Sequence, residues 1–142
     1  MDVHSKKIRS YNMSRIKSYN TKPEIYIRKL LHKNGYRYIL KSRINNIEPD
    51  VVLTKHKTCV FVHGCFWHSH ANCKYNVIPK SNTNFWKEKL NKNKERDLRT
   101  IKTLNKNDWK TLIIWECTIK KKKISINDVK AFLKSKKKYQ EI

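Results

Sequence analysis

Cysteine and histidine are concentrated in one short segment, and their spacing restricts how the chain can fold. Cys65, His70 and Cys73 form a C-x4-H-x2-C pattern, and Cys117 follows a distant apolar run. Three thiolates and one imidazole are the ligand set of a closed, tetrahedral structural Zn²⁺ site. Such a site would wrap a loop around one ion and fix it to the strand that carries the fourth ligand. Because protein ligands fill the coordination sphere, this zinc is not expected to be catalytic.

Two other interpretations of the cysteines stay open at this point. The thiols could be free and buried in a reducing compartment, or Cys59 could replace one of the four ligands. Cys59 falls within a β-like run where a small apolar side chain is suitable, so we leave it out of the ligand set. Disulfides are disfavoured because the N-terminal residues lack the apolar region of a secretory signal.

The rest of the chain predicts a mixed α/β fold. Helices are predicted from the N-cap Thr21 to Asn34-Gly35, from Thr83 or Asn84 to about Asn107, and from Ile126 to Leu133. Strands are predicted at 36–40, 50–53, 58–63 and 111–115, with a hairpin turn at 55–57. Residues 64–82 lack periodicity and are predicted to form a long ordered loop. The second helix is expected to face the core through Trp86, Leu90, Leu98, Ile101 and Leu104.

The charge of the chain points to a polyanionic partner. Lys and Arg number 34 against 11 Asp and Glu, a formal net charge of +23. Nucleic acid is the first candidate, and an acidic membrane surface is the second. The apolar runs are too short to span a bilayer, so we expect no membrane association and a cytoplasmic, nucleoid-associated protein. One domain is expected over 1–142, with an N-terminal arm at 1–20 and a basic C-terminal segment at 118–142.

A carboxylate and two histidines near the predicted hairpin indicate hydrolytic chemistry. Asp50 follows Pro49 at the start of a buried strand, where Mg²⁺ is a natural partner for its oxygens. Many Mg²⁺-dependent nucleases place Glu-x-Lys on the next strand, but this chain has no acid there. The metal would then take a backbone carbonyl, that of Val62, and the role of base would pass to His63 or His68.

Six short blocks resemble, in order, the very-short-patch-repair (Vsr) DNA mismatch endonucleases. They are TKPE at 21–24, PD at 49–50, HGCFWHSH at 63–70, NFW at 84–86, NKERD at 93–97 and WEC at 115–117. The resemblance implies a restriction-endonuclease-like fold of the PD-(D/E)xK type, with a mixed central sheet flanked by helices and a zinc-stapled loop. It also implies a Mg²⁺-dependent nick in one DNA strand beside a T:G mismatch, the product of 5-methylcytosine deamination. Residues after Thr118 carry no family motif.

By this resemblance, Asp50 is the metal-binding carboxylate and the carbonyl of Val62 the second protein ligand. His68 corresponds to the general base that activates water. His63 and Glu24 correspond to supporting residues near the scissile phosphate. The four zinc ligands also match the family: they are Cys65, His70, Cys73 and Cys117.

The resemblance implies that aromatic side chains wedge into DNA beside the mismatch, where unstacking costs less than at a matched step. Trp86 has an alternative role in core packing of its helix, because it also begins the apolar stripe. The residues expected to contact DNA are Met13, Phe66, Trp67, Trp86, Lys89 and Asn93.

The expected partner is double-stranded DNA with a T:G mismatch, bound by a monomer, and the resemblance adds mismatch-repair proteins as possible partners. Two other functions stay open. The chain could be a related sequence-specific or defence nuclease with the same core, or a non-catalytic zinc-stapled DNA-binding module. The presence of Asp50, His63 and His68 favours an enzyme.

Overall fold

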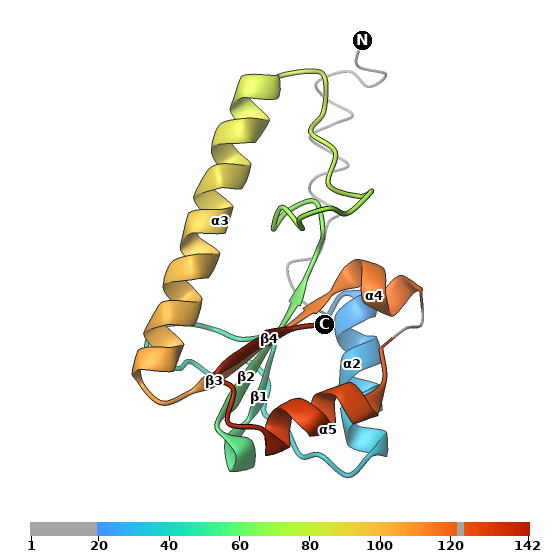
Figure 1. The fold of residues 1–142 in the computed structure, drawn as a ribbon, viewed down its shortest axis with the longest axis vertical. Coiled ribbons are helices and arrows are strands. Elements are labelled where there is room, and N and C mark those ends of the chain that lie inside the picture. Colours follow the sequence, from blue (N-terminus) through green and yellow to red (C-terminus); the bar gives the residue numbers. More distant parts are fainter. Residues whose placement is uncertain (1–19, 122–123) are drawn as a thin grey trace.

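The computed structural model describes residues 20–121 and 124–142. Its sheet has four strands in the order β1-β2-β3-β4. Strand β1 (Val51–Leu53) is antiparallel to β2 (Thr58–His63), as the predicted hairpin requires. Strand β3 (Lys110–Trp115) is parallel to both β2 and the edge strand β4 (Tyr139–Glu141). This mixed sheet, flanked by helices, confirms the expected mixed α/β class (Figure 1).

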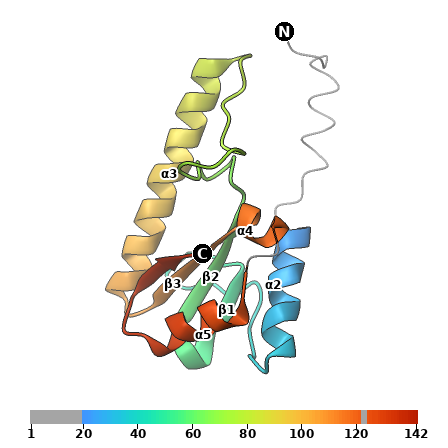
Figure 2. The same ribbon diagram turned by 45° about the vertical axis from the view of Figure 1, so that its right-hand side comes forward.

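Helices cover the sheet from two sides (Figures 1 and 2). Helices α2 (Lys22–Lys33), α4 (Glu116–Lys120) and α5 (Ile126–Lys134) lie on one side. The long α3 (Thr83–Lys106) lies on the other side and extends beyond the sheet, where the loop after β2 runs beside it. A single 3-10 turn (Thr54–His56) joins β1 to β2. None of the helices in the described ranges is long and apolar enough to cross a membrane.

Side-chain alternation along β3 divides the interior into two clusters. Leu112 and Ile114 pack into the larger core, together with apolar side chains of α2 and α5. Ile113 and Trp115 point the other way, toward α3 and the cysteine-rich loop. Successive side chains of a strand point to opposite faces, so the central strand supplies both clusters.

Helix α2 begins and ends where local chemistry predicts. The Thr21 hydroxyl accepts a hydrogen bond from the Glu24 N–H, and Pro23 occupies the first turn. The helix ends at Asn34, and Gly35 follows with a φ of 83°, a left-handed conformation that favours glycine.

Four features differ from the sequence-based expectations. The segment 36–40 is not a strand: in the described chain it makes only an isolated bridge between Ile39 and Val52, because β1 is short. The predictions omitted α4 and β4. Leu98 is 60% exposed instead of buried, because it lies roughly 80° around the axis of α3 from the buried Leu90. Met13 and the predicted arm up to residue 19 lie outside the described residues.

Candidate active site and metal cluster

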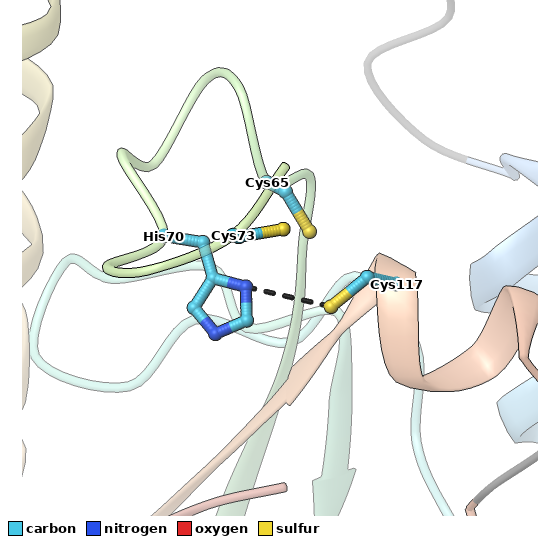
Figure 3. A group of neighbouring side chains, drawn as sticks. All are labelled: Cys65, His70, Cys73 and Cys117. Carbon is cyan, nitrogen blue, oxygen red and sulfur yellow. Dashed lines mark hydrogen bonds between the residues drawn. The ribbon is translucent and has the colours of Figure 1, made fainter. Parts of the chain in front are cut away.

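The side chains of Cys65, His70, Cys73 and Cys117 converge at one end of the sheet (Figure 3). Their ligand atoms all lie within 4.8 Å of one another, and the Nδ1 of His70 is 3.4 Å from the Sγ of Cys117. Strand register explains the convergence, since residues 63 and 115 are paired and each cysteine follows two positions later. This set of thiol and imidazole donors fits a metal ion such as Zn²⁺.

Cys59 lies apart from this cluster. Its side chain is fully buried in the sheet, and burial raises the pKa of the thiol to about 12. A thiol that stays protonated in an apolar environment is an inert packing group. Its position agrees with leaving Cys59 out of the ligand set.

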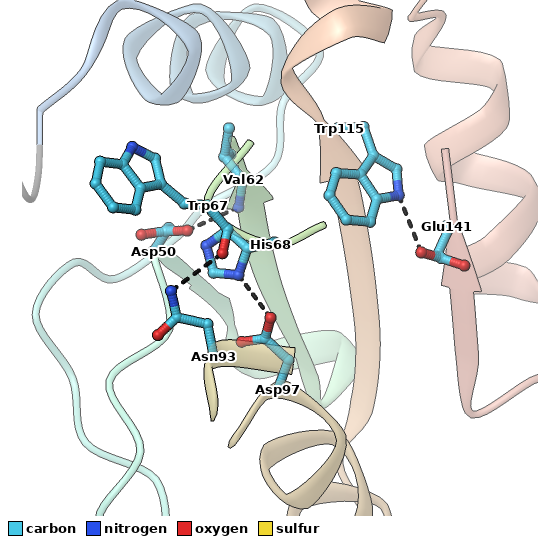
Figure 4. A network of polar contacts seen from close by, with 8 residues as sticks. All are labelled: Asp50, Val62, Trp67, His68, Asn93, Asp97, Trp115 and Glu141. Atoms are coloured by element: carbon cyan, nitrogen blue, oxygen red, sulfur yellow. Dashed lines mark hydrogen bonds and ion pairs between the residues drawn. The ribbon is translucent and has the colours of Figure 1, made fainter. Parts of the chain in front are cut away.

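Asp50 and Val62 meet where the β1–β2 ladder stops. Val51 pairs with Val60, so the same register would place Pro49 opposite Val62. Proline has no N–H, and Pro49 therefore cannot donate to the Val62 carbonyl. The Val62 N–H donates to the side chain of Asp50, with 2.7 Å between its nitrogen and Oδ2 (Figure 4).

The Asp50 carboxylate thus contacts the backbone of Val62, and the carboxylate and the Val62 carbonyl are both oxygen donors of the kind that Mg²⁺ prefers. Burial, with a smaller contribution from the neighbouring Glu24, raises the pKa of the Asp50 carboxyl from its ordinary 3.8 to about 7. The Val62 N–H and the charge of Arg28 oppose this rise. A buried carboxyl that gives up its proton with difficulty is a group that a divalent cation would stabilise in its ionised form. The donor set therefore fits a hard cation.

His68, on the loop after β2, forms an ion-pair contact with Asp97 of α3. Its Nδ1 lies 2.6 Å from Oδ2 of Asp97 (Figure 4). An ionised carboxylate can only accept a hydrogen bond, so Nδ1 carries the proton in this contact. The other ring nitrogen, Nε2, is then the unprotonated one in a neutral imidazole, and it is the atom able to take a proton.

The imidazole of His63 stacks on that of His68. The ring centroids are 3.7 Å apart and the planes differ by 6°. Burial, and the positive charge that His68 can carry, lower the pKa of His63 to about 3, so its ring is neutral near neutral pH. The ligand atoms of His63, His68 and Asp97 lie within 4.8 Å of one another, but Nδ1 of His68 is engaged by Asp97.

A cavity of about 450 Å³ brings these groups together. The predicted residues that line it are Glu24, Asp50, Val62, His63 and His68. Sequence reasoning assigned no role to three further lining residues: Glu48, Arg96 and Asp97. A clue to Asp97 was its spacing, because it lies four residues after Asn93 and therefore on the same face of α3.

The three predicted wedge aromatics form one cluster, and two of them, Phe66 and Trp67, directly precede His68 in the loop. Phe66 lies 5.2 Å from Trp67 and 5.4 Å from Trp86, and the two tryptophans are 5.9 Å apart, measured between ring centroids. All three are partly exposed. Trp86, in the first turn of α3, packs on the loop aromatics and belongs to neither core cluster.

Lys89 and Asn93 both lie against this aromatic cluster. The Lys89 ammonium is 6.0 Å from the ring centroid of Trp67. The Asn93 Nδ2 donates to the Trp67 carbonyl at 3.2 Å (Figure 4). One turn further along α3, Asp97 holds His68. The helix therefore fixes two consecutive loop residues, one aromatic and one titratable.

Comparisons with known proteins agree on one family. A family model described as DNA mismatch endonuclease Vsr matches residues 1–75. The type II nicking enzyme V.NmeAIP of Neisseria meningitidis serogroup A is 46% identical over 123 residues, which is 87% of each chain. The DNA mismatch endonuclease Vsr of Escherichia coli is 39% identical over 119 residues, which is 84% of this chain and 76% of its own.

The type II nicking enzyme V.XorIIP of Xanthomonas oryzae is 38% identical over 78% of this chain and 81% of its own. Among solved structures, the catalytic domain of the homing endonuclease I-Bth0305I aligns with 80% of this chain and 88% of its own, at 18% identity and a TM-score of 0.46. On the family model and the sequence relatives, the chain belongs to the Vsr family of DNA mismatch endonucleases and is an enzyme that nicks DNA.

Proposed function

We propose that the protein makes a Mg²⁺-dependent nick in one DNA strand next to a T:G mismatch, the lesion left when 5-methylcytosine deaminates. One observation carries the proposal. Two groups of residues line the same cavity: Asp50 and Val62, whose oxygens suit a metal ion, and His68 with Asp97, a candidate general base and the carboxylate that holds it. Two residues of the aromatic cluster, Phe66 and Trp67, directly precede His68 in the chain. The E. coli relative bears the name of a mismatch endonuclease.

His68 serves as general base. Asp97 keeps the proton on Nδ1, so that Nε2 is free to remove a proton from the attacking water and Asp97 stabilises the imidazolium that results. His63, neutral and stacked beneath His68, holds the ring in its plane. Glu24 is buried at 8% exposure, and its Oε2 accepts from the N–H of Asn20, which fixes this carboxylate at the wall of the cavity.

Asp50 and Val62 would hold the catalytic cation. When bound, Mg²⁺ supplies a Lewis acid for the phosphate oxygens and a fixed positive charge where negative charge develops. The four ligands Cys65, His70, Cys73 and Cys117 would hold a structural Zn²⁺, whose purpose is to fix the loop that carries His68.

Selectivity for the mismatch would come from the aromatic cluster of Phe66, Trp67 and Trp86. Their π-faces are partly exposed and lie together, which suits insertion between base pairs. A mismatched step is unstacked at lower cost than a matched one, so the wedge enters there preferentially. Lys89 and Asn93 lie at the same place and are suited to contact the exposed base edges.

The test uses end-labelled duplexes that differ in one base pair. One carries T:G, another the matched C:G, and others carry different mismatches, each with Mg²⁺ titrated from zero. We expect a nick in the thymine-containing strand of the T:G duplex, with no cutting in the absence of Mg²⁺. Equal cutting of the matched duplex would contradict mismatch recognition.

A second candidate is a sequence-specific nicking enzyme with the same catalytic core, because five relatives are named type II nicking enzymes. The same duplexes separate the candidates when the flanking sequence is varied. Nicking that follows the flanking sequence in matched DNA would support the second candidate, whereas nicking that follows the mismatch supports the first.

A further inference from the structure

The edge strand β4 lies within the basic segment that carries no family motif, yet it contacts the site. Its backbone joins β3 along the whole strand, with Thr111 donating to Lys138 at 2.8 Å and Ile142 donating to Ile113 at 2.8 Å. The register places Glu141 opposite Ile113. Trp115 lies two residues after Ile113 on the same face of the sheet, so Glu141 is its diagonal neighbour across the strands.

Both N–H groups of Trp115 donate to the C-terminal residues, one to Glu141 of β4 and one to Ile142 directly after it. Its backbone N–H donates to the Ile142 carbonyl at 3.0 Å, and its indole Nε1 donates to Oε1 of Glu141 at 2.9 Å (Figure 4). The indole N–H is a donor only and is buried with the ring, which is 6% exposed. Without the carboxylate this donor would lose its partner, so the bond fixes the rotation of the ring.

The Trp115 ring in turn contacts both halves of the site. Its plane stacks on the imidazole of the metal-cluster residue His70, with centroids 4.0 Å apart and 5° between the planes. It meets His63 edge-on, at 5.3 Å and 75°. His63 is stacked on His68, so the indole lies between the metal cluster and the histidine pair.

We propose that Glu141 is a positioning residue for the nicking reaction, acting from β4 through Trp115 on the orientation of His63 and His68. The proposal rests on the function proposed above for His68. A second cavity, of about 230 Å³, lies where β4 meets this site, and Glu141, Trp115, His63 and His68 all line it. Free space there means that the indole can turn once the hydrogen bond is lost, and the stacked histidines would turn with it.

The test compares Glu141→Leu with Glu141→Gln. Leucine removes the acceptor, whereas the glutamine carbonyl can still accept from the indole N–H. We expect the single-turnover nicking rate of Glu141→Leu to fall by about tenfold, in the range found for residues that orient site ligands from behind. Glu141→Gln should stay close to the wild-type rate. DNA affinity should not change in either variant, because Glu141 is not among the residues proposed to contact DNA, and an unchanged metal content would show that a slower rate does not come from loss of the cluster on which Trp115 stacks.

The matched control is Gln140→Leu, on the same strand but with its side chain on the opposite face. It should nick at the wild-type rate. The proposal is overturned if Glu141→Leu nicks normally, if Glu141→Gln falls as far as Glu141→Leu, or if Gln140→Leu falls equally, since the last outcome would mean that only the integrity of β4 matters.

Two further measurements keep the test decisive. Trp115→Phe replaces the indole by a smaller phenyl ring that has no N–H to donate to Glu141, so it should slow nicking at least as much as Glu141→Leu and tests the same contact if Glu141→Leu does not fold; a wild-type rate would contradict the proposal. In ¹⁵N-labelled protein, the indole N–H resonance that Trp115→Phe removes should shift in Glu141→Leu and stay in Glu141→Gln. This resonance does not depend on the DNA substrate, so failure of the positioning role is distinguishable from failure of the proposed mismatch specificity.

Discussion

Ionised Asp50 is unfavourable in the folded protein unless a cation lies beside it. In the unfolded chain the carboxyl ionises near 3.8, whereas in the folded protein burial raises its pKa to about 7. The folded state therefore binds more protons between these values, and stability falls as pH rises through this window, with the full penalty present above pH 7. The proposed metal ligand is therefore a residue whose ionised form destabilises the fold when no cation is bound.

Asp50→Asn should abolish nicking and leave DNA binding largely intact. In buffer without Mg²⁺ at pH 8, it should raise the free energy of unfolding by on the order of 2 kcal/mol, and by less at pH 5. The amide oxygen can still accept from the Val62 N–H. His63 has the opposite pH dependence, but both proteins carry it, so its contribution cancels.

Urea denaturation at the two pH values, with zinc retained, measures this difference. Adding Mg²⁺ should stabilise only the wild-type protein and narrow the gap. If the variant is less stable than wild type at pH 8, or loses DNA binding, Asp50 is a structural residue.

The contact between His68 and Asp97 predicts a second loss of rate. Asp97→Asn removes the charge that stabilises the imidazolium, and because an amide can donate as well as accept, it no longer fixes the proton on Nδ1 of His68; kcat should fall by about 100-fold or more while DNA affinity stays similar. Glu95→Gln is the matched control, since Glu95 is an exposed acid on the same helix. Equal losses in both variants would mean that α3 merely needs its negative charge.

At this scale the sequence predicts some residues and misses others for a physical reason. Asp50, His63 and His68 stand out because polar side chains interrupt or end apolar runs. Asp97 does not, because it is an ordinary acid on a charged helix until packing brings it to a loop residue 29 positions away. Glu141 is missed for the same reason, since its role depends on strand pairing.

Among the elements, those defined by local chemistry are the ones that the sequence predicts. Helix α2 carries its own cap and stop, and β2 is bounded as predicted. The omitted elements, α4 and β4, have five and three residues, too few for an apolar period to show. They exist because tertiary contacts support them: Cys117 and Ile119 are buried, and β4 pairs with β3. The prediction of a strand at 36–40 is wrong for the opposite reason. The residues favour β structure, but the segment pairs with the sheet at a single bridge, between Ile39 and Val52.

Lys110 ties β3 to the end of α5, and its replacement should weaken the fold without touching the site. Its ammonium donates to the carbonyls of Phe132, Leu133 and Ser135, at 2.6, 3.3 and 2.9 Å. Lys110→Met should lower the free energy of unfolding by about 1–3 kcal/mol, because the carbonyls at this helix end lose a charged donor. Urea denaturation measures the loss, with the exposed Lys106→Met as control. Similar losses in both variants would contradict the capping role.

The metal cluster predicts a further effect, on the loop after β2. Cys117→Ser should lower the zinc content of the purified protein and its thermal stability, because the loop loses its attachment to α4. Cys59→Ala is the matched control: it removes a buried thiol outside the cluster and should leave zinc bound. Metal analysis of both variants side by side measures the zinc content. Unchanged zinc in Cys117→Ser would refute the ligand set.

For the whole molecule, acidic and basic side chains occupy different places. The acids Glu24, Glu48 and Asp50 line the cavity, although the chain as a whole carries +23. Exposed lysines occupy α3 next to the wedge aromatics, while others lie on α5, across the sheet. The sequence predicts the polyanion partner from the sum of charges. It cannot tell which lysines face the DNA, because that depends on where the helices pack.

Salt should therefore weaken binding to matched and T:G duplexes alike and leave their affinity ratio nearly constant, because unstacking by uncharged rings releases no counterions. Lys87→Gln, on α3 beside Trp86, should reduce the slope of log K against log salt by about 1. Lys134→Gln, exposed on α5 across the sheet, is the matched control and should leave the slope unchanged. Fluorescence anisotropy over a salt series measures both slopes.

Two outcomes would contradict these expectations. Equal slopes for the two variants would mean that the DNA does not lie along α3. A T:G preference that vanishes with salt would mean that charge, not the aromatic cluster, selects the mismatch.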